Sequence, residues 1–104
     1  MKPALAYTVI AEIDDEAVAA EYLAWLVDGH LAEVRAGGAL EASVVRVKSA
    51  KAKFEVRYLF ADAAAFAAYE AGPAIALRAD SAARFPPSRG VHQTRWLGEQ
   101  LARV

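Results

Sequence analysis

The chain has 104 residues, of which 57% are hydrophobic, and its formal net charge is −1. This length predicts a single domain over residues 1–104, and a near-neutral charge without basic or acidic runs predicts no binding to nucleic acid or to an anionic membrane. The chain has no cysteine, which excludes disulfides, thiol catalysis and thiolate metal ligands. No apolar run approaches the roughly 20 residues of a membrane span. We therefore expect a cytoplasmic protein, and the apolar content favours a buried self-interface.

The chain begins with a predicted strand and a long predicted helix. Residues 5–13 are rich in β-branched and aromatic side chains, as is typical of a strand. Asp14 or Asp15 then provides an N-cap for a helix that runs to about Arg35. The helix is expected to end at Gly37-Gly38, because glycine readily adopts the left-handed conformation of a C-cap.

The apolar stripe of this helix goes out of register near its middle. Val18, Tyr22 and Trp25 recur at three- and four-residue spacing and share one face. After Gly29-His30 the large apolar side chains fall on another side of the cylinder. The pattern therefore places Trp25 and His30 at an irregularity in the helix.

Two further strands follow, and the second of them alternates strictly. Residues 40–48 predict a strand, and a polar turn separates them from a strand over residues 53–61. In the latter, one face carries the aromatic and aliphatic side chains and the other carries a charged pair. The apolar face holds Phe54, Val56, Tyr58 and Phe60, and the opposite face holds Glu55, Arg57 and Leu59.

The last part of the chain predicts an interrupted helix and a final strand. Asp62 caps a short helix that Gly72-Pro73 interrupts. Helical structure resumes over residues 74–84, and a strand follows over residues 90–98. The resulting βαββαβ order predicts an α+β ferredoxin-like fold, a four-stranded antiparallel sheet with both helices on one face. The uncovered face is apolar enough to pack against a second copy, which predicts a homodimer, a dimeric α/β barrel.

Three stretches of this sequence stand out, W-L-V-D-G-H-L-A-E-V-R-A-G-G (25–38), F-E-V-R-Y-L-F (54–60) and A-L-R-A-D-S-A-A-R-F-P-P-S-R-G-V (76–91). They resemble a bacterial family, the domain of unknown function 4286. That family lies within the dimeric α/β-barrel superfamily, which includes cofactor-independent quinol monooxygenases, muconolactone-type isomerases, polyketide cyclases and haem proteins. The resemblance implies the fold, a dimer and a pocket between each subunit's sheet and helices. It implies no particular reaction.

His30 is the candidate acid or base, because several enzymes of that superfamily carry a histidine near the end of the first helix. An imidazole gives or takes a proton near neutrality. The competing interpretation is a half-buried histidine bonded to a backbone carbonyl that the irregular turn has freed. Trp25 and Tyr58 are candidate pocket walls for an aromatic ligand, with an ordinary core role as the alternative. Arg78 is a candidate anion anchor, and a surface ion pair with Asp80 is its alternative.

Other polar residues favour structural roles. Glu55 and Arg57 share a sheet face and favour an ion pair that sets the dimer register over an anion site. His92, Thr94 and Trp96 share a face of the last strand, which either lines the pocket or meets the dimer partner. The two histidines lack metal-ligand spacing, so neither a metal site nor a cofactor is expected.

Two functional hypotheses follow from these observations. The first is an uncharacterised homodimeric binding module with an apolar pocket between sheet and helices. The second is a cofactor-independent isomerase, cyclase or monooxygenase that acts on an aromatic or polyketide-like molecule, with His30 as acid or base. The enzyme hypothesis requires an enclosed cavity that His30 lines. It fails if His30 points into solvent or if both of its ring nitrogens are bonded to the backbone.

Overall fold

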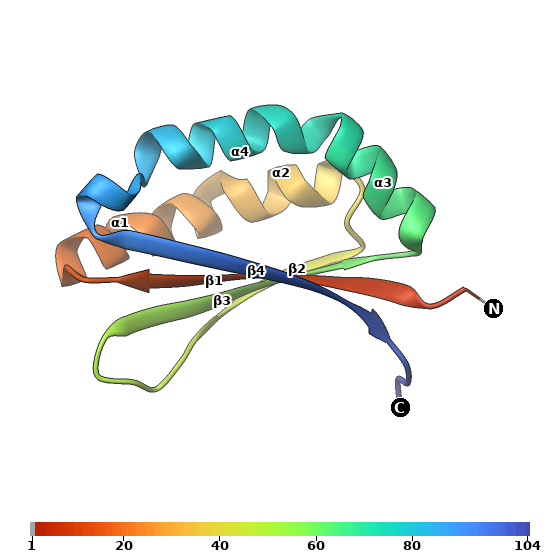
Figure 1. Cartoon of the computed structure of the whole chain (residues 1–104), viewed down its shortest axis with the longest axis horizontal. Helices are drawn as coiled ribbons and strands as arrows, with labels where there is room; N and C mark the ends of the chain where they lie inside the picture. Colours follow the sequence, from red (N-terminus) through yellow and green to blue (C-terminus); the bar gives the residue numbers. More distant parts are fainter. Residues whose placement is uncertain (1) are drawn as a thin grey trace.

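The computed structural model describes residues 2–104 and has two layers, a sheet below and helices above (Figure 1). The sheet contains four antiparallel strands in the order β2-β3-β1-β4. This is the predicted ferredoxin-like arrangement. The elements in chain order are β1 (Ala4–Ile13), α1 (Glu16–Trp25), the π-helical turn η1 (Leu26–His30), α2 (Leu31–Ala36), β2 (Glu41–Arg46), β3 (Ala52–Phe60), α3 (Ala63–Ala71), α4 (Pro73–Arg84), the 3₁₀ turn η2 (Pro87–Arg89) and β4 (Val91–Gln100).

The core lies between the sheet and the helices. Alternate residues of β3 from Phe54 to Phe60 are almost fully buried there, as strict alternation predicts. Tyr22, Leu26 and Val34 cover them from the helical layer. The predicted charged pair on the opposite face of β3, Glu55 and Arg57, accordingly lies on the face of the sheet that no helix covers.

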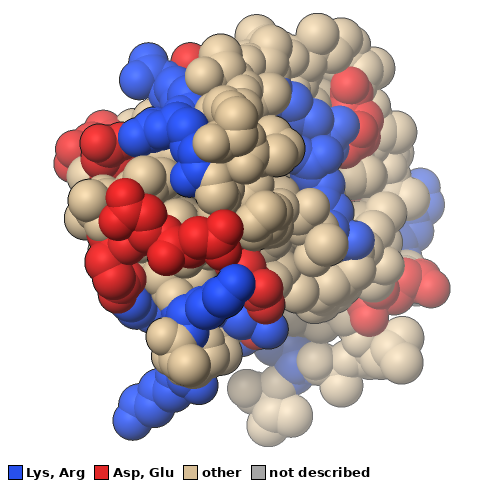
Figure 2. Space-filling view, turned by 60° about the vertical axis from the view of Figure 1, so that its left-hand side comes forward, with Lys and Arg blue, Asp and Glu red and all other residues tan. Residues whose placement is uncertain are grey.

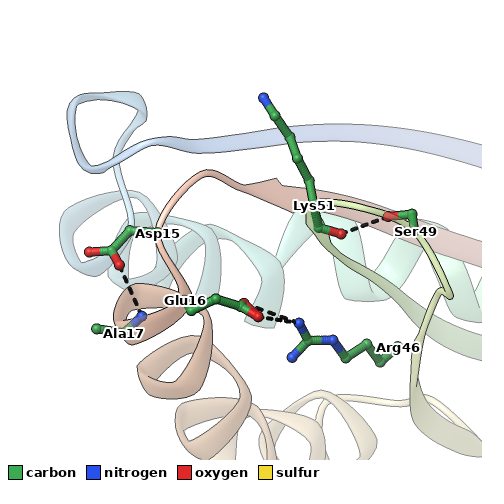
Figure 3. Close-up of polar contacts among 6 residues, drawn as sticks. All are labelled: Asp15, Glu16, Ala17, Arg46, Ser49 and Lys51. Carbon is green, nitrogen blue, oxygen red and sulfur yellow. Dashed lines mark hydrogen bonds and ion pairs between the residues drawn. The ribbon is translucent and has the colours of Figure 1, made fainter.

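The predicted first helix is a single rod with a wider turn in its middle. It begins at Asp15, whose side chain accepts a hydrogen bond from the Ala17 backbone N–H at 3.1 Å (Figure 3). Over Leu26–His30 the backbone follows the π-helical pattern, in which the Leu31 N–H donates to the Leu26 carbonyl five residues earlier. The break in the apolar stripe is therefore a real change in helical geometry. At the C-terminal end, Gly38 is the residue with positive φ (131°).

Polar contacts join the start of α1 to the β2–β3 hairpin. Glu16 and Arg46 form an ion pair, with Nη2 2.6 Å from Oε1, and the Ser49 hydroxyl donates to the Lys51 carbonyl within the hairpin turn (Figure 3). Asp14 takes no part in capping. Its carboxylate contacts Lys51 and His92 at 3.1 Å each. On the face that Figure 2 shows, acidic side chains gather toward the left and basic side chains lie above and below them.

The second helical segment consists of two helices joined at a sharp break. α3 begins at Asp62, which accepts a hydrogen bond from the Ala65 N–H at 2.8 Å, and it ends at Gly72. Pro73 then starts α4, where its missing N–H costs nothing. The final strand β4 extends to Gln100, two residues beyond the predicted end. In the helical layer, α4 lies above the sheet beside the first helical rod (Figure 1).

Candidate active site

A small internal cavity lies between the sheet and the helical layer. Its volume is about 30 Å³. All four tyrosines of the chain line it, and they come from β1, α1, β3 and α3. They are Tyr7, Tyr22, Tyr58 and Tyr69. Trp25, His30 and Arg78 line it from the helical layer, so every predicted site residue lies at this one cavity.

The π-helical turn is what brings Trp25 and His30 together. In a regular α-helix, residues five apart differ by about 140° around the axis, because each residue turns the chain by about 100°. The wider turn over Leu26–His30 places the two side chains almost one above the other. Their rings stack with centroids 4.0 Å apart and planes inclined by 22°. The break in the apolar stripe therefore marks the π-helical turn that forms this corner of the cavity.

His30 is held as a neutral imidazole. Its Nδ1 is buried and has no hydrogen-bond partner, so the predicted bond to a freed backbone carbonyl is absent. Desolvation lowers the pKa of His30 to about 4, and the charge of Asp80 opposes this shift only in part. An imidazole in this state accepts a proton or a hydrogen bond from a ligand, but it stores no proton to donate at neutral pH. Neither observation that would exclude a catalytic role is present, because His30 is only partly exposed and its buried Nδ1 has no backbone partner.

Arg78 is already occupied by protein groups. Its guanidinium forms a two-pronged ion pair with Glu70, including a bond of 2.6 Å between Nη1 and Oε2, and Nη2 donates to the Tyr7 hydroxyl at 3.1 Å. Hydrogen bonding from Arg78 holds the pKa of Glu70 below its usual value. Nε of Arg78 is buried without a partner. The predicted pairing of Arg78 with Asp80 is wrong, since Asp80 pairs with Arg84 at 2.9 Å. As an anion anchor, Arg78 is thus largely neutralised.

Burial keeps the hydroxyls of Tyr22, Tyr58 and Tyr69 protonated. Burial is the main cause that raises the pKa of Tyr69 to about 12, and it raises the pKa values of Tyr22 and Tyr58 further. The neighbouring tyrosines Tyr7, Tyr22 and Tyr69 add to the shift at Tyr58. Neutral hydroxyls around a shared space are hydrogen-bond donors. The cavity therefore offers hydroxyl donors from both the sheet and the helices, and the unpaired Nδ1 of His30 from the helical rod.

The cavity opens toward a groove between α4 and β4. This α4–β4 groove has a volume of about 180 Å³ and shares Arg78, Ser81, Gln93 and Arg95 with the cavity wall. Arg95 is exposed, and among residues 2–104 it forms no ion pair within 4.0 Å. It is the free cation nearest the cavity. Our sequence reasoning missed Gln93 and Arg95, because both faces of β4 carry polar residues and the pattern does not show which one points inward.

The register of β4 shows on which side of the sheet His92, Thr94 and Trp96 lie. Thr8 of β1 pairs with Trp96, and Ile10 pairs with Thr94, which places His92, Thr94 and Trp96 on the uncovered side of the sheet. Trp96 lines a hollow of about 350 Å³ there, together with Thr8, Glu55 and Arg57. The Glu55–Arg57 pair, with 3.0 Å between Oε1 and Nη2, forms within one strand of one chain.

A second depression reaches His30 from outside. This outer groove has a volume of about 340 Å³ and lies between the first helical rod and α4. Its lining residues are Trp25, Asp28, Gly29, His30, Glu33, Asp80 and Arg84. Trp25 and His30 are thus the two residues shared between the outer groove and the inner cavity.

Within the described part of the chain, two further features are absent. No three histidine, aspartate or glutamate side chains gather closely enough to hold a metal ion. No helix has the length and apolar character needed to cross a bilayer.

Comparison with known proteins identifies the fold and no sequence family. No protein-family model matches the chain, and no curated protein matches it. Among solved structures, a dimeric ferredoxin-like protein from an uncultured marine organism superposes with a TM-score of 0.75 at 18% identity, over 99% of this chain and 100% of that one. The ActVA-Orf6 monooxygenase of Streptomyces coelicolor, solved with nanaomycin D, gives 0.73 at 13% identity over 98% and 91%. SnoaB, a cofactor-independent oxygenase of Streptomyces nogalater, gives 0.69 at 14% identity over 98% and 97%. The chain therefore has the ferredoxin-like α+β fold of these proteins.

Proposed function

We propose that the cavity and the α4–β4 groove together bind a hydroxylated ring, and that His30 accepts a proton from the ring hydroxyl. The observation that carries the proposal is the cavity itself, with its buried unpaired imidazole nitrogen beside four tyrosines. An unpaired buried polar atom is costly, and a ligand hydroxyl would relieve that cost. The chain would then be a cofactor-independent isomerase, cyclase or monooxygenase acting on an aromatic or polyketide-like molecule.

The volumes restrict how such a ligand could sit. The inner cavity of about 30 Å³ holds little more than a water-sized group, so a whole ring does not fit inside it. A dry cavity of about 150 Å³ accommodates benzene, and the α4–β4 groove offers about 180 Å³. We therefore place the ring in the groove with its hydroxyl directed into the cavity. Further rings would extend outward along β4.

The low pKa of His30 and the positive charge of Arg95 favour a ligand whose hydroxyl is acidic. An ordinary phenol has a pKa of about 10, far above the pKa of about 4 of His30, so proton transfer from it is strongly uphill. An enol of a dicarbonyl or a hydroxyquinone is more acidic, and the Arg95 guanidinium at the groove would stabilise its anion. The O–H bond breaks, the proton goes to His30, and the electron pair stays on oxygen. Isomerisation, ring closure and attack on dioxygen all begin from such an enolate.

The solved neighbours support this chemistry by analogy. One is described as a cofactor-independent oxygenase and another as a monooxygenase in complex with nanaomycin D. A third, from Caulobacter crescentus, is described as a putative antibiotic biosynthesis monooxygenase. The analogy concerns fold, since identities lie at 19% or below in these three cases. The finer resemblance to the domain of unknown function 4286 stays a prediction.

Binding of 4-nitrophenol, an acidic single-ring phenol that absorbs visibly when ionised, tests the proposal. Calorimetry should show that His30→Leu weakens binding by about tenfold or more, since loss of the acceptor leaves the ligand hydroxyl unpaired at a cost of about 1–3 kcal/mol. The matched control is His92→Leu on the uncovered face, which should bind as the unmodified protein does. Equal affinities for both variants would contradict the role of His30.

The alternative function is a binding module without chemistry, and the small inner cavity favours it. The same probe distinguishes the two functions. In the enzyme, Arg95 and His30 should increase the ionised fraction of bound 4-nitrophenol at a fixed pH, which raises its visible absorbance. A module would bind the probe with its ionised fraction unchanged.

We also propose that the uncovered sheet face pairs with a second copy to form a homodimer. The hollow on this face is walled by apolar and charged residues together, including the half-exposed Trp96. Two of the solved neighbours are described as dimeric ferredoxin-like proteins. Burial of the face would remove apolar surface from water.

A further inference from the structure

Two stacked rings of the first helical rod lie between the inner cavity and the outer groove. Trp25 and His30 line the inner cavity and also line the outer groove, so no other side chain is common to the two spaces. The ring stack is held by the π-helical turn, with 4.0 Å between centroids. Both residues are partly exposed, whereas Tyr22 and Leu26 beside them are buried. The stack is therefore the part of the cavity wall that the outer groove also reaches.

We propose that the outer groove is a second opening of the site, through which His30 exchanges its proton with solvent while the ligand occupies the α4–β4 groove. This inference rests on the proposed function in one respect, namely that His30 takes the ligand's proton. That proton then leaves the imidazolium for a water molecule in the outer groove. The net change is one proton moved from the ligand hydroxyl to water, and His30 returns to its neutral state.

The charges around His30 suit this direction of transfer. Asp28, Glu33 and Asp80 line the outer groove, and Arg84 is the cation among them. A negative surface attracts protons released beside it. The inner side presents tyrosine hydroxyls and the unpaired cation Arg95, which repels a proton. The charged and titratable groups that line the two spaces on either side of His30 are Tyr7, Tyr22, Asp28, Glu33, Tyr58, Tyr69, Arg78, Asp80, Arg84 and Arg95.

Gly29 allows the outer groove to be filled without disturbing the cavity. It lines the groove but not the cavity, and a Cβ added there would meet only the Glu33 Oε1, at 3.9 Å. The variant Gly29→Leu should therefore plug the groove, and Gly29→Ala is its size control. For the other opening, Ala82 is an exposed residue of the α4–β4 groove that does not line the cavity, so Ala82→Trp should obstruct that groove.

Acylation of histidine by diethyl pyrocarbonate measures access to His30 without any substrate. The chain has two histidines, and the exposed His92 serves as the internal reference. Peptide mass spectrometry should show that Gly29→Leu slows modification of His30 several-fold relative to His92, and that Gly29→Ala leaves the ratio unchanged. Ala82→Trp should also leave this ratio unchanged, although it weakens binding of 4-nitrophenol. Gly29→Leu should bind 4-nitrophenol normally.

The two variants separate the inference from the proposed function. If Ala82→Trp slows modification of His30 and Gly29→Leu does not, His30 is reached through the ligand groove and the second opening is wrong. If neither opening affects 4-nitrophenol binding, the proposed function fails while the modification ratios still report on access. Trp25→Ala provides an independent measurement should Gly29→Leu fold poorly. It removes half of the ring stack and should accelerate modification of His30, and an unchanged rate would overturn the inference.

Discussion

His30 makes the stability of this protein depend on pH in a defined interval. Its pKa is about 6.5 in an unfolded chain and about 4 in the folded protein, because burial disfavours the imidazolium. Between these values the unfolded state binds more protons than the folded state, so the free energy of unfolding falls as pH falls from 6.5 to 4. Above pH 6.5 the group is neutral in both states and contributes no pH dependence.

Urea denaturation at pH 7 and at pH 4.5 measures this dependence. The loss of stability between the two pH values should be smaller in His30→Gln than in the unmodified protein. Asp14, Glu70 and Asp80 also have lowered pKa values, so both proteins lose stability in acid and only the difference between them reports on His30. Identical losses would show that His30 titrates normally in the folded protein.

At the level of single residues, the candidate site could be predicted only in part. Trp25 and His30 were recognisable because they lie where a regular apolar pattern breaks, and such a break shows in the sequence. Arg95 was not recognisable, since β4 carries polar side chains on both faces and its inward face follows from its pairing with β1. The partner of Arg78 was also hidden, because Glu70 lies eight residues away across the break between α3 and α4.

At the scale of elements, two glycines of the first helical rod have opposite environments. A Cβ at Gly37 would lie 2.9 Å from the Pro73 Cβ and 3.3 Å from the Tyr69 Cδ1, where the rod meets the junction of α3 and α4. Gly29, in the π-helical turn, has open space beside it. The close approach at Gly37 leaves no room for a methyl group, so the packing of the two helical segments depends on it.

Alanine at the two positions should therefore change stability in opposite directions. Gly37→Ala should destabilise by about 1–3 kcal/mol through overpacking, whereas Gly29→Ala should stabilise by up to about 1 kcal/mol through the better helix propensity of alanine. Urea denaturation of both variants at pH 7 checks the pair. Stabilisation by Gly37→Ala would mean that the helical junction relaxes freely.

The elements themselves followed closely from the sequence. Strict alternation in β3 and the caps at Asp15 and Asp62 are local signals, and the structure confirms them. The volume of the cavity was not predictable, because it depends on how closely α4 approaches the sheet. That distance results from long-range packing of many side chains, including the contact between Gly37 and Pro73.

For the whole molecule, the uncovered sheet face is the feature that bears on assembly. Trp96 is 49% exposed on this face, and Ile75 is 66% exposed on α4 on the opposite side. Replacing either by serine removes exposed apolar surface. If the sheet face forms the homodimer interface, Trp96→Ser should shift sedimentation at micromolar concentration toward the monomer, and Ile75→Ser should leave it unchanged. A monomeric unmodified protein would contradict the proposed homodimer.

The π-helical turn is equivalent to the insertion of one residue into an otherwise regular α-helix. Removing a residue from it would let Glu16–Ala36 close into an uninterrupted α-helix with every carbonyl in standard register. The sheet and the rest of the core would need no change, but the ring of residue 30 would no longer lie over that of Trp25. One inserted residue thus accounts for the Trp25–His30 stack, and the fold itself does not require that residue.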